Sequence, residues 1–169
     1  MKKYRFVILL LALLVNINAQ AKTVGFCCVQ DTNALIGSEQ LTTALETALF
    51  DVCFDSGLIA TTVAYDVPGY EGYANNFLLN KALASTVDYL TIVYCESESN
   101  TAASSSGELS DWNHIYCKLV DFTSERMMFE KKIPVALHQD KDILMQAYTM
   151  GQRIGNMVIQ EVLHNSNGR

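Results

Sequence analysis

The sequence predicts an α/β (α+β) domain with a single mixed β-sheet and helices packed on it, in the order β-α-β-α-β-β-β-α. Three observations support this prediction. Residues 23–29 form a nearly unbroken apolar run, which is typical of a strand buried on both faces. Residues 38–56 and 140–164 repeat apolar residues three and four positions apart, as amphipathic helices do. Several segments between them are rich in β-branched and aromatic residues, which favour strands.

The first part of the chain alternates strands and helices. After the strand at 23–29 comes the helix at 38–56, for which Ser38 is a suitable N-cap. Gly57 can adopt the left-handed conformation that ends helices. A second strand is predicted at 59–65, where larger residues alternate with small ones. These elements form a strand-helix-strand unit.

The middle of the chain contains more turn and loop signals. Segment 66–72 has a Pro-Gly pair and a second glycine, which predict an ordered loop. A shorter helix is expected at 74–85 and a third strand at 87–95. The stretch 96–111 is almost wholly polar and has small side chains, so we expect a mobile loop there.

The last part of the chain completes the sheet and adds the longest helix. Two strands are predicted at 112–122 and 127–136, and Pro134 confines the second of them to an edge or to its exit. The helix at 140–164 carries Gly151 and Gly155 one turn apart. Because glycine has no side chain, another element can approach this helix closely.

The first 21 residues are typical of a secretory signal peptide with cleavage near Ala21. Three basic residues precede an apolar run at 6–15, which is shorter than the roughly 20 residues that a membrane-spanning helix needs. Removing this peptide from the 169 residues leaves 148, so residues 22–169 have the size of one domain. We therefore expect a periplasmic or secreted protein with no transmembrane segment.

Composition narrows the classes of partner. Of the 12 Lys and Arg residues, nine lie outside the predicted signal peptide and face 18 acidic residues, a net charge of −9. This balance argues against nucleic acid and anionic membranes as partners, since both attract basic patches. The first cysteine, Cys27, lies well inside a predicted strand, so we expect no N-terminal lipid anchor.

The five cysteines are an odd number, so at least one stays unpaired within a monomer. Cys27 and Cys28 are adjacent on a strand and should point to opposite faces. Cys95 and Cys117 are the best candidates for a disulfide, because both lie on strands that we expect to pair. Otherwise the cysteines are interpreted as small buried hydrophobic residues, and no spacing of cysteine and histidine predicts a metal site.

Catalytic signatures are weak. The histidines are His114, His138 and His164, and none has a partner at an informative spacing. A nucleophile pair of Cys28 with His114 is an open alternative, although no catalytic, phosphate-binding or calcium-binding motif accompanies it. The sequence therefore predicts a protein that is not an enzyme, with no catalytic residues and no cofactor.

Aromatic residues supply the candidates for partner binding. Tyr70 and Tyr73 lie beside glycines in the predicted loop, where they can either anchor a partner or hold the loop against its own domain. Trp112 follows the polar stretch and is either a plug of the core or a contact residue. Both alternatives stay open for each of them.

Three short phrases carry a family resemblance: FDSGLIAT at 54–61, DYL at 88–90 and KLVDFTSERMMFEKKI at 118–133. In this order they resemble the envelope group that contains the LpoB activators of penicillin-binding proteins, the curli secretion protein CsgG and the amino-terminal domain of TolB. The resemblance implies a non-enzymatic domain that binds partner proteins in the bacterial envelope. The lipid anchor of the activators has no counterpart here, which leaves a periplasmic binding or assembly domain.

The favoured function is an exported envelope domain that binds a partner protein, in cell-envelope assembly or in the regulation of peptidoglycan synthesis. Two alternatives remain from the residues alone. One is a small-ligand carrier with its pocket between the sheet and the terminal helix. The other is a small envelope enzyme that uses a cysteine or a histidine.

Overall fold

The computed structural model describes residues 21–31, 38–63, 69–79, 87–97, 112–135 and 142–166. The predicted order of strands and helices is confirmed. The elements are β1 (Thr23–Gln30), α2 (Ser38–Asp55), β2 (Ile59–Thr62), α3 (Gly69–Leu79), β3 (Tyr89–Ser97), β4 (Trp112–Asp121), β5 (Arg126–Pro134) and α4 (Ile143–Ser166).

The strands form one five-stranded sheet in the order β2-β1-β3-β4-β5. β1 pairs in parallel with β2 and β3, because a crossover that contains a helix separates it from each of them. β3, β4 and β5 pair antiparallel. The sheet is therefore mixed, as predicted, and β5 is an edge strand that ends at Pro134, also as predicted.

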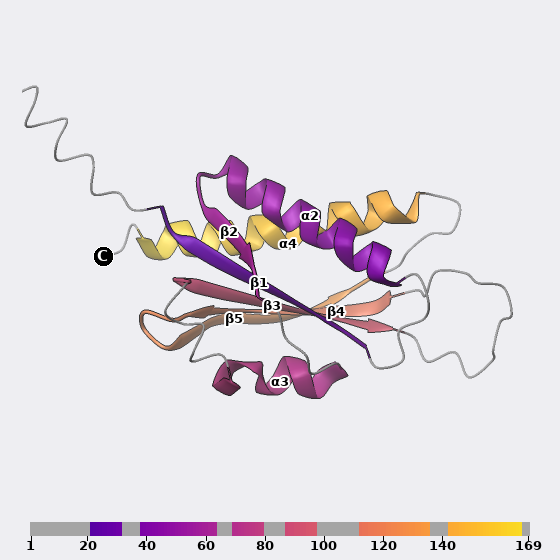
Figure 1. Cartoon of the computed structure of the whole chain (residues 1–169), viewed down its shortest axis with the longest axis horizontal. Coiled ribbons are helices and arrows are strands. Elements are labelled where there is room, and N and C mark those ends of the chain that lie inside the picture. The colour runs from indigo at the N-terminus through magenta and orange to yellow at the C-terminus, as the bar shows by residue number, and fades with distance from the viewer. Residues whose placement is uncertain are drawn as a thin grey trace, which may run out of the picture.

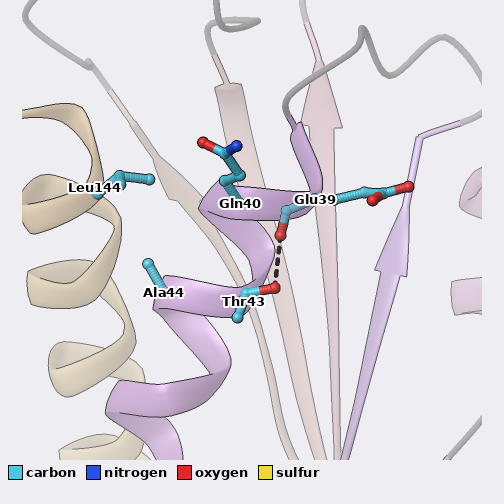
Figure 2. A pocket seen from close by; sticks show the side chains of 5 residues that line it. All are labelled: Glu39, Gln40, Thr43, Ala44 and Leu144. Atoms are coloured by element: carbon cyan, nitrogen blue, oxygen red, sulfur yellow. Dashed lines mark hydrogen bonds between the residues drawn. The ribbon is translucent and has the colours of Figure 1, made fainter.

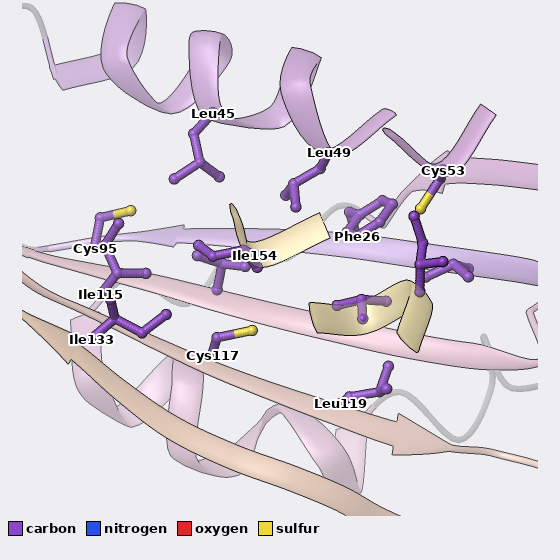
Figure 3. Close-up of a cluster of buried hydrophobic side chains, with 14 of the residues drawn as sticks. Phe26, Leu45, Leu49, Cys53, Cys95, Ile115, Cys117, Leu119, Ile133 and Ile154 are labelled. Atoms are coloured by element: carbon purple, nitrogen blue, oxygen red, sulfur yellow. The ribbon is translucent and has the colours of Figure 1, made fainter. Parts of the chain in front are cut away.

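Helices cover the two faces of the sheet unequally. Figure 1 shows α2 and α4 on one face and α3 alone on the other. Successive side chains of β1 point to opposite faces of the sheet. Phe26 and Cys28 pack in the hydrophobic cluster beneath α2 and α4, whereas Cys27 packs in the cluster beneath α3. The prediction that Cys27 and Cys28 point to opposite faces is confirmed. Leu45 and Ile154 contribute to the larger cluster from the two helices (Figure 3).

Helices α2 and α4 run side by side in the same direction, and two glycines bring them close together. A Cβ atom added to Gly151 would clash with the carbonyl oxygen of Leu45 and would lie 2.8 Å from the Cβ atom of Ala48. A Cβ atom on Gly155 would lie 3.2 Å from the Val52 side chain. The prediction that these glycines permit close packing is confirmed.

The helix before the third strand begins earlier than predicted. Gly69 has a φ of 77° and is the first residue of α3, so the expected loop over 66–72 is wrong for residues 69–72. Burial of Gly72 and Tyr73 against the sheet outweighs the low helix propensity of glycine. The rest of the expected loop and residues 80–85 of the expected helix lie outside the described residues.

Other boundaries also differ. β2 ends at Thr62, although the Val63 amide still donates to the Phe26 carbonyl at 2.7 Å, and residues 64 and 65 of the expected strand lie outside the described residues. Glu96 and Ser97 belong to β3, where they lie opposite His114 and Trp112, and not to the expected polar loop. The remainder of that loop, 98–111, lies outside the described residues. Gly57, with a φ of 74°, ends α2 as predicted.

Candidate functional site

Four tyrosines converge on the sheet face that α3 covers: Tyr70 and Tyr73 from α3, Tyr94 from β3 and Tyr116 from β4. Each ring contacts the other three, with centroids 5.7 to 6.1 Å apart. We call these four residues the tyrosine cluster. Tilted and edge-on ring pairs at such distances stabilise by about 0.5–1.5 kcal/mol each beyond the burial of area.

Local structure explains why these rings meet. Tyr70 and Tyr73 are three residues apart on α3 and so lie on the same side of the helix. Tyr94 and Tyr116 are directly opposite each other in the antiparallel β3–β4 pair. Tyr73 and Tyr94 are buried, whereas Tyr70 is 54% exposed. The cluster therefore presents one half-exposed ring to solvent on a rigid base.

A buried lysine lies beneath the cluster. The Lys118 ammonium donates to the carbonyl oxygens of Tyr73 and Ala74 and lies 4.3 Å from the centroid of the Tyr73 ring. Burial lowers the pKa of Lys118, while nearby Glu130 acts in the opposite direction. The Tyr73 hydroxyl donates to Glu130 Oε1 at 2.9 Å. These contacts attach α3 to β4 and β5.

Three charged or titratable side chains border the cluster, and we call Glu96, His114 and Lys132 the polar rim. His114 Nδ1 lies 3.0 Å from Glu96 Oε2, which also accepts a hydrogen bond from the Tyr116 hydroxyl at 3.4 Å. Lys132 Nζ lies 4.9 Å from the centroid of the Tyr116 ring. A hydrogen bond with Tyr116 is the main cause of a raised pKa of Lys132. The rim therefore offers both donors and acceptors beside the exposed ring of Tyr70.

The two buried phenols of the cluster are held in their neutral form. Burial raises the pKa of Tyr73, and its hydrogen bond to Glu130 raises it further. Burial also raises the pKa of Tyr94, with Asp31 as the next cause. Both phenols consequently stay neutral near pH 7 and do not supply a phenolate base. What remains is an aromatic surface with hydrogen-bonding groups at its border.

The structure treats the predicted aromatic candidates differently. Tyr70 and Tyr73 come together, but on a helix and not on a loop, and only Tyr70 is accessible to a partner. Trp112 is 2% exposed and belongs to the core cluster beneath α2 and α4, so it is a core plug and its assignment as a contact residue is wrong. Sequence reasoning missed Tyr94 and Tyr116. Alternation of polar or aromatic residues at 114, 116 and 118 with apolar residues at 115, 117 and 119 would have indicated a second functional face on β4.

The candidate disulfide between Cys95 and Cys117 is not formed. Both residues are buried free thiols on one face of the β3–β4 pair, as the choice of paired strands implied. The register, however, places Cys95 opposite Ile115 and Cys117 opposite Val93. Diagonal positions in an antiparallel pair are about 7–8 Å apart, which is beyond the usual Cα separation of a disulfide.

The thiols are also poor nucleophiles. Burial raises the pKa of Cys28 well above its ordinary value, with Glu46 as the next cause, and raises the pKa of Cys53 to about 11 and of Cys117 to about 12. Cys28 faces α2 and α4, whereas His114 lies on the opposite face of the sheet beside Tyr116. A nucleophile pair of Cys28 with His114 is therefore not assembled.

We expect the thiols of Cys28, Cys53, Cys95 and Cys117 to react with iodoacetamide at pH 8 at least about 100-fold more slowly in the native protein than in urea. The pKa of Cys53 and of Cys117 is higher in the folded protein than the ordinary value of 9.0, so folding favours the neutral thiol. The stability that these two thiols contribute is therefore fully present below pH 9.0 and is lost as the pH rises through about 11 to 12. Peptide mass spectrometry after timed alkylation measures each rate. A cysteine that reacts as fast in the native protein as in urea would instead support the alternative of a small enzyme with a reactive cysteine.

A pocket of about 420 Å³ lies apart from the tyrosine cluster. Figure 2 shows it between the first turns of α2 and α4, where Glu39, Gln40, Thr43, Ala44 and Leu144 line it. The carrier alternative placed its pocket between the sheet and the terminal helix, but core side chains such as Ile154 and Val158 fill that interface. The pocket of Figure 2 is open and contains none of the predicted site residues.

Two further features concern the described ranges. No group of three or more His, Cys, Asp or Glu residues there is arranged to hold a metal ion. Among the helices that the structure describes, none has the length and apolar character needed to cross a membrane.

Comparison with protein families shows which family the chain belongs to. A family model with the description "Uncharacterised protein" matches residues 23–163. The chain belongs to this family. No curated protein matches its sequence.

Solved structures with the same fold have little sequence in common with this member of the family. TolB from Acinetobacter baumannii is similar with a TM-score of 0.50 and 14% identity, over 85% of this chain and 28% of the TolB chain. Protein XCC0632 from Xanthomonas campestris is similar with a TM-score of 0.50 and 12% identity, over 87% of this chain and 88% of that protein. These likenesses support the fold, including the resemblance to TolB. The resemblance to LpoB and CsgG stays a prediction.

Proposed function

We propose that this chain is an exported, non-enzymatic domain of the bacterial envelope that binds a partner protein through the tyrosine cluster and its polar rim. The main support for this proposal is that Tyr70 is 54% exposed although its ring contacts those of Tyr73, Tyr94 and Tyr116. The signal-peptide pattern and the TolB-like fold support the envelope location. The partner belongs to cell-envelope assembly or to the regulation of peptidoglycan synthesis.

The energetics of recognition favour such a surface. A tyrosine that is already held by neighbouring rings loses little conformational entropy on binding, yet it offers a large contact area and a hydroxyl. Residues of this kind often dominate the affinity of protein interfaces. The Glu96–His114 pair and Lys132 border the ring and can form hydrogen bonds with the partner.

Site-specific crosslinking tests the proposal. A photoreactive phenylalanine analogue replaces Tyr70 in the full chain, expressed in its native host, and the matched control carries it at Arg153, an exposed position on α4. We expect a discrete crosslinked partner protein from position 70 and none from position 153. We also expect Tyr70→Ala to weaken the purified complex by roughly 30-fold, as hot-spot residues do, and Tyr70→Phe to weaken it much less.

Two results would count against the proposal. One is the same set of crosslinked proteins from positions 70 and 153. The other is a partner whose affinity is unchanged by Tyr70→Ala in a variant that stays folded by circular dichroism.

A further inference from the structure

The two edges of the sheet differ in length and exposure. β2 forms one edge and spans only 4 residues, which is a common way to limit unwanted strand pairing. β5 forms the other edge with 9 residues, and among the described residues no strand lies beyond it (Figure 1). Of those 9 residues only Ile133 is fully buried. β5 thus presents a long row of backbone groups at an accessible edge.

The lysines of β5 lie over the faces of the sheet. Lys132 is directly opposite Tyr116 on β4, and its ammonium lies 4.9 Å from the centroid of that ring, inward from the edge. Lys131 lies on the other face, 5.3 Å from the centroid of Phe129 and 3.9 Å from the sulfur of Met157 on α4. The edge strand therefore carries one cation over each face of the sheet.

The charge of β5 is opposite to that of the protein. Arg126, Lys131 and Lys132 outnumber Glu130, so the strand carries a net charge of +2. The chain as a whole carries −6, and more once the basic signal peptide is removed. An added strand with acidic side chains is therefore electrostatically complementary to β5, whereas β5 of a second copy would bring like charges together.

We propose that the free edge of β5 receives an extended acidic segment of the partner protein as a sixth strand. This inference rests on the proposed function and extends its binding surface, because Lys132 belongs both to β5 and to the rim of the tyrosine cluster. Backbone hydrogen bonds to β5 supply affinity, and alternate acidic side chains beside Lys131 or Lys132 supply specificity.

A model peptide tests the edge directly. The probe is a nine-residue peptide of alternating threonine and glutamate, and its counterpart has lysine in place of glutamate. We expect the acidic peptide to slow amide hydrogen exchange in residues 126–134 at least about tenfold, and the basic peptide to leave it unchanged. We expect Lys132→Glu and Lys131→Glu each to lower the affinity for the acidic peptide about tenfold. The matched charge reversal Arg153→Glu should leave this affinity unchanged. Thermal melts verify that each variant is folded.

Several outcomes would overturn the inference. They are equal binding of the two peptides, protection of amides outside β5, and a dimer in sedimentation equilibrium that the peptide dissociates, since a second copy would then occupy the edge. Failure here is separable from failure of the proposed function. If a partner crosslinks to position 70 but leaves the β5 amides unprotected, only the proposed strand addition at β5 is rejected. If β5 is specifically protected but position 70 gives no crosslink, only the proposed role of the tyrosine cluster is rejected.

Discussion

Replacing Tyr73 with alanine is expected to lower the free energy of unfolding by about 3–5 kcal/mol, the range for removing a large buried aromatic side chain. Tyr73 is 1% exposed and contacts the other three rings of the cluster. Its removal also takes away the ring over which the Lys118 ammonium lies. Urea denaturation at pH 7, followed by circular dichroism, measures the change.

Two matched variants separate the parts of this effect. Tyr73→Phe keeps the ring and loses only the hydrogen bond to Glu130, so we expect a loss of about 1–2 kcal/mol. Tyr70→Ala removes a half-exposed ring with three ring contacts and should lower stability by about 2 kcal/mol, which is less than for Tyr73→Ala, while it weakens partner binding roughly 30-fold. A stability loss for Tyr70→Ala as large as that for Tyr73→Ala would show that Tyr70 is structural.

The second large effect is expected at the contact between α2 and α4. Gly151→Ala places a Cβ atom against the Leu45 carbonyl oxygen, which belongs to the α2 backbone and cannot rotate away. Overpacking of this kind destabilises by about 3 kcal/mol, and the better helix propensity of alanine offsets about 1 kcal/mol of it. We therefore expect a net loss of about 2 kcal/mol in urea denaturation.

Gly155→Ala is the natural control, because the three atoms nearest to the added Cβ atom all belong to side chains, with Val52 at 3.2 Å and Leu49 at 3.7 Å. A small adjustment of that side chain should accommodate it, and the propensity gain should leave stability within about 1 kcal/mol of the original protein. If the two alanine variants were equally stable, the close approach of α2 and α4 at Gly151 would be disproved.

Prediction from sequence succeeded where a periodic pattern had only one reasonable partner. The spacing of Leu41, Leu45 and Leu49 indicated α2, and the paired glycines on the last helix indicated the close approach of another element. It failed where burial overrode local propensity. Gly69 and Gly72 suggested a loop, yet packing of Tyr73 over Lys118 holds these residues in α3.

The candidate site shows the same division. Tyr70 was selected correctly as an exposed aromatic residue, but its neighbours Tyr94 and Tyr116 come from strands 24 and 46 residues further along the chain. Only the register of β3 against β4 places those two rings opposite each other. The same register separates Cys95 from Cys117, so a single pairing decided both the tyrosine cluster and the absence of the predicted disulfide.

The sequence by itself determined the order of strands and helices, the opposite faces of Cys27 and Cys28, and the room for a close neighbour at Gly151, because these follow from hydrophobic periodicity and side-chain size along short stretches of chain. Only the tertiary structure decided which strands are neighbours, which tyrosine stays exposed and which edge stays open. Those features depend on the register between segments that are distant in the chain, and a shift of one residue would turn every side chain of a strand to the other face.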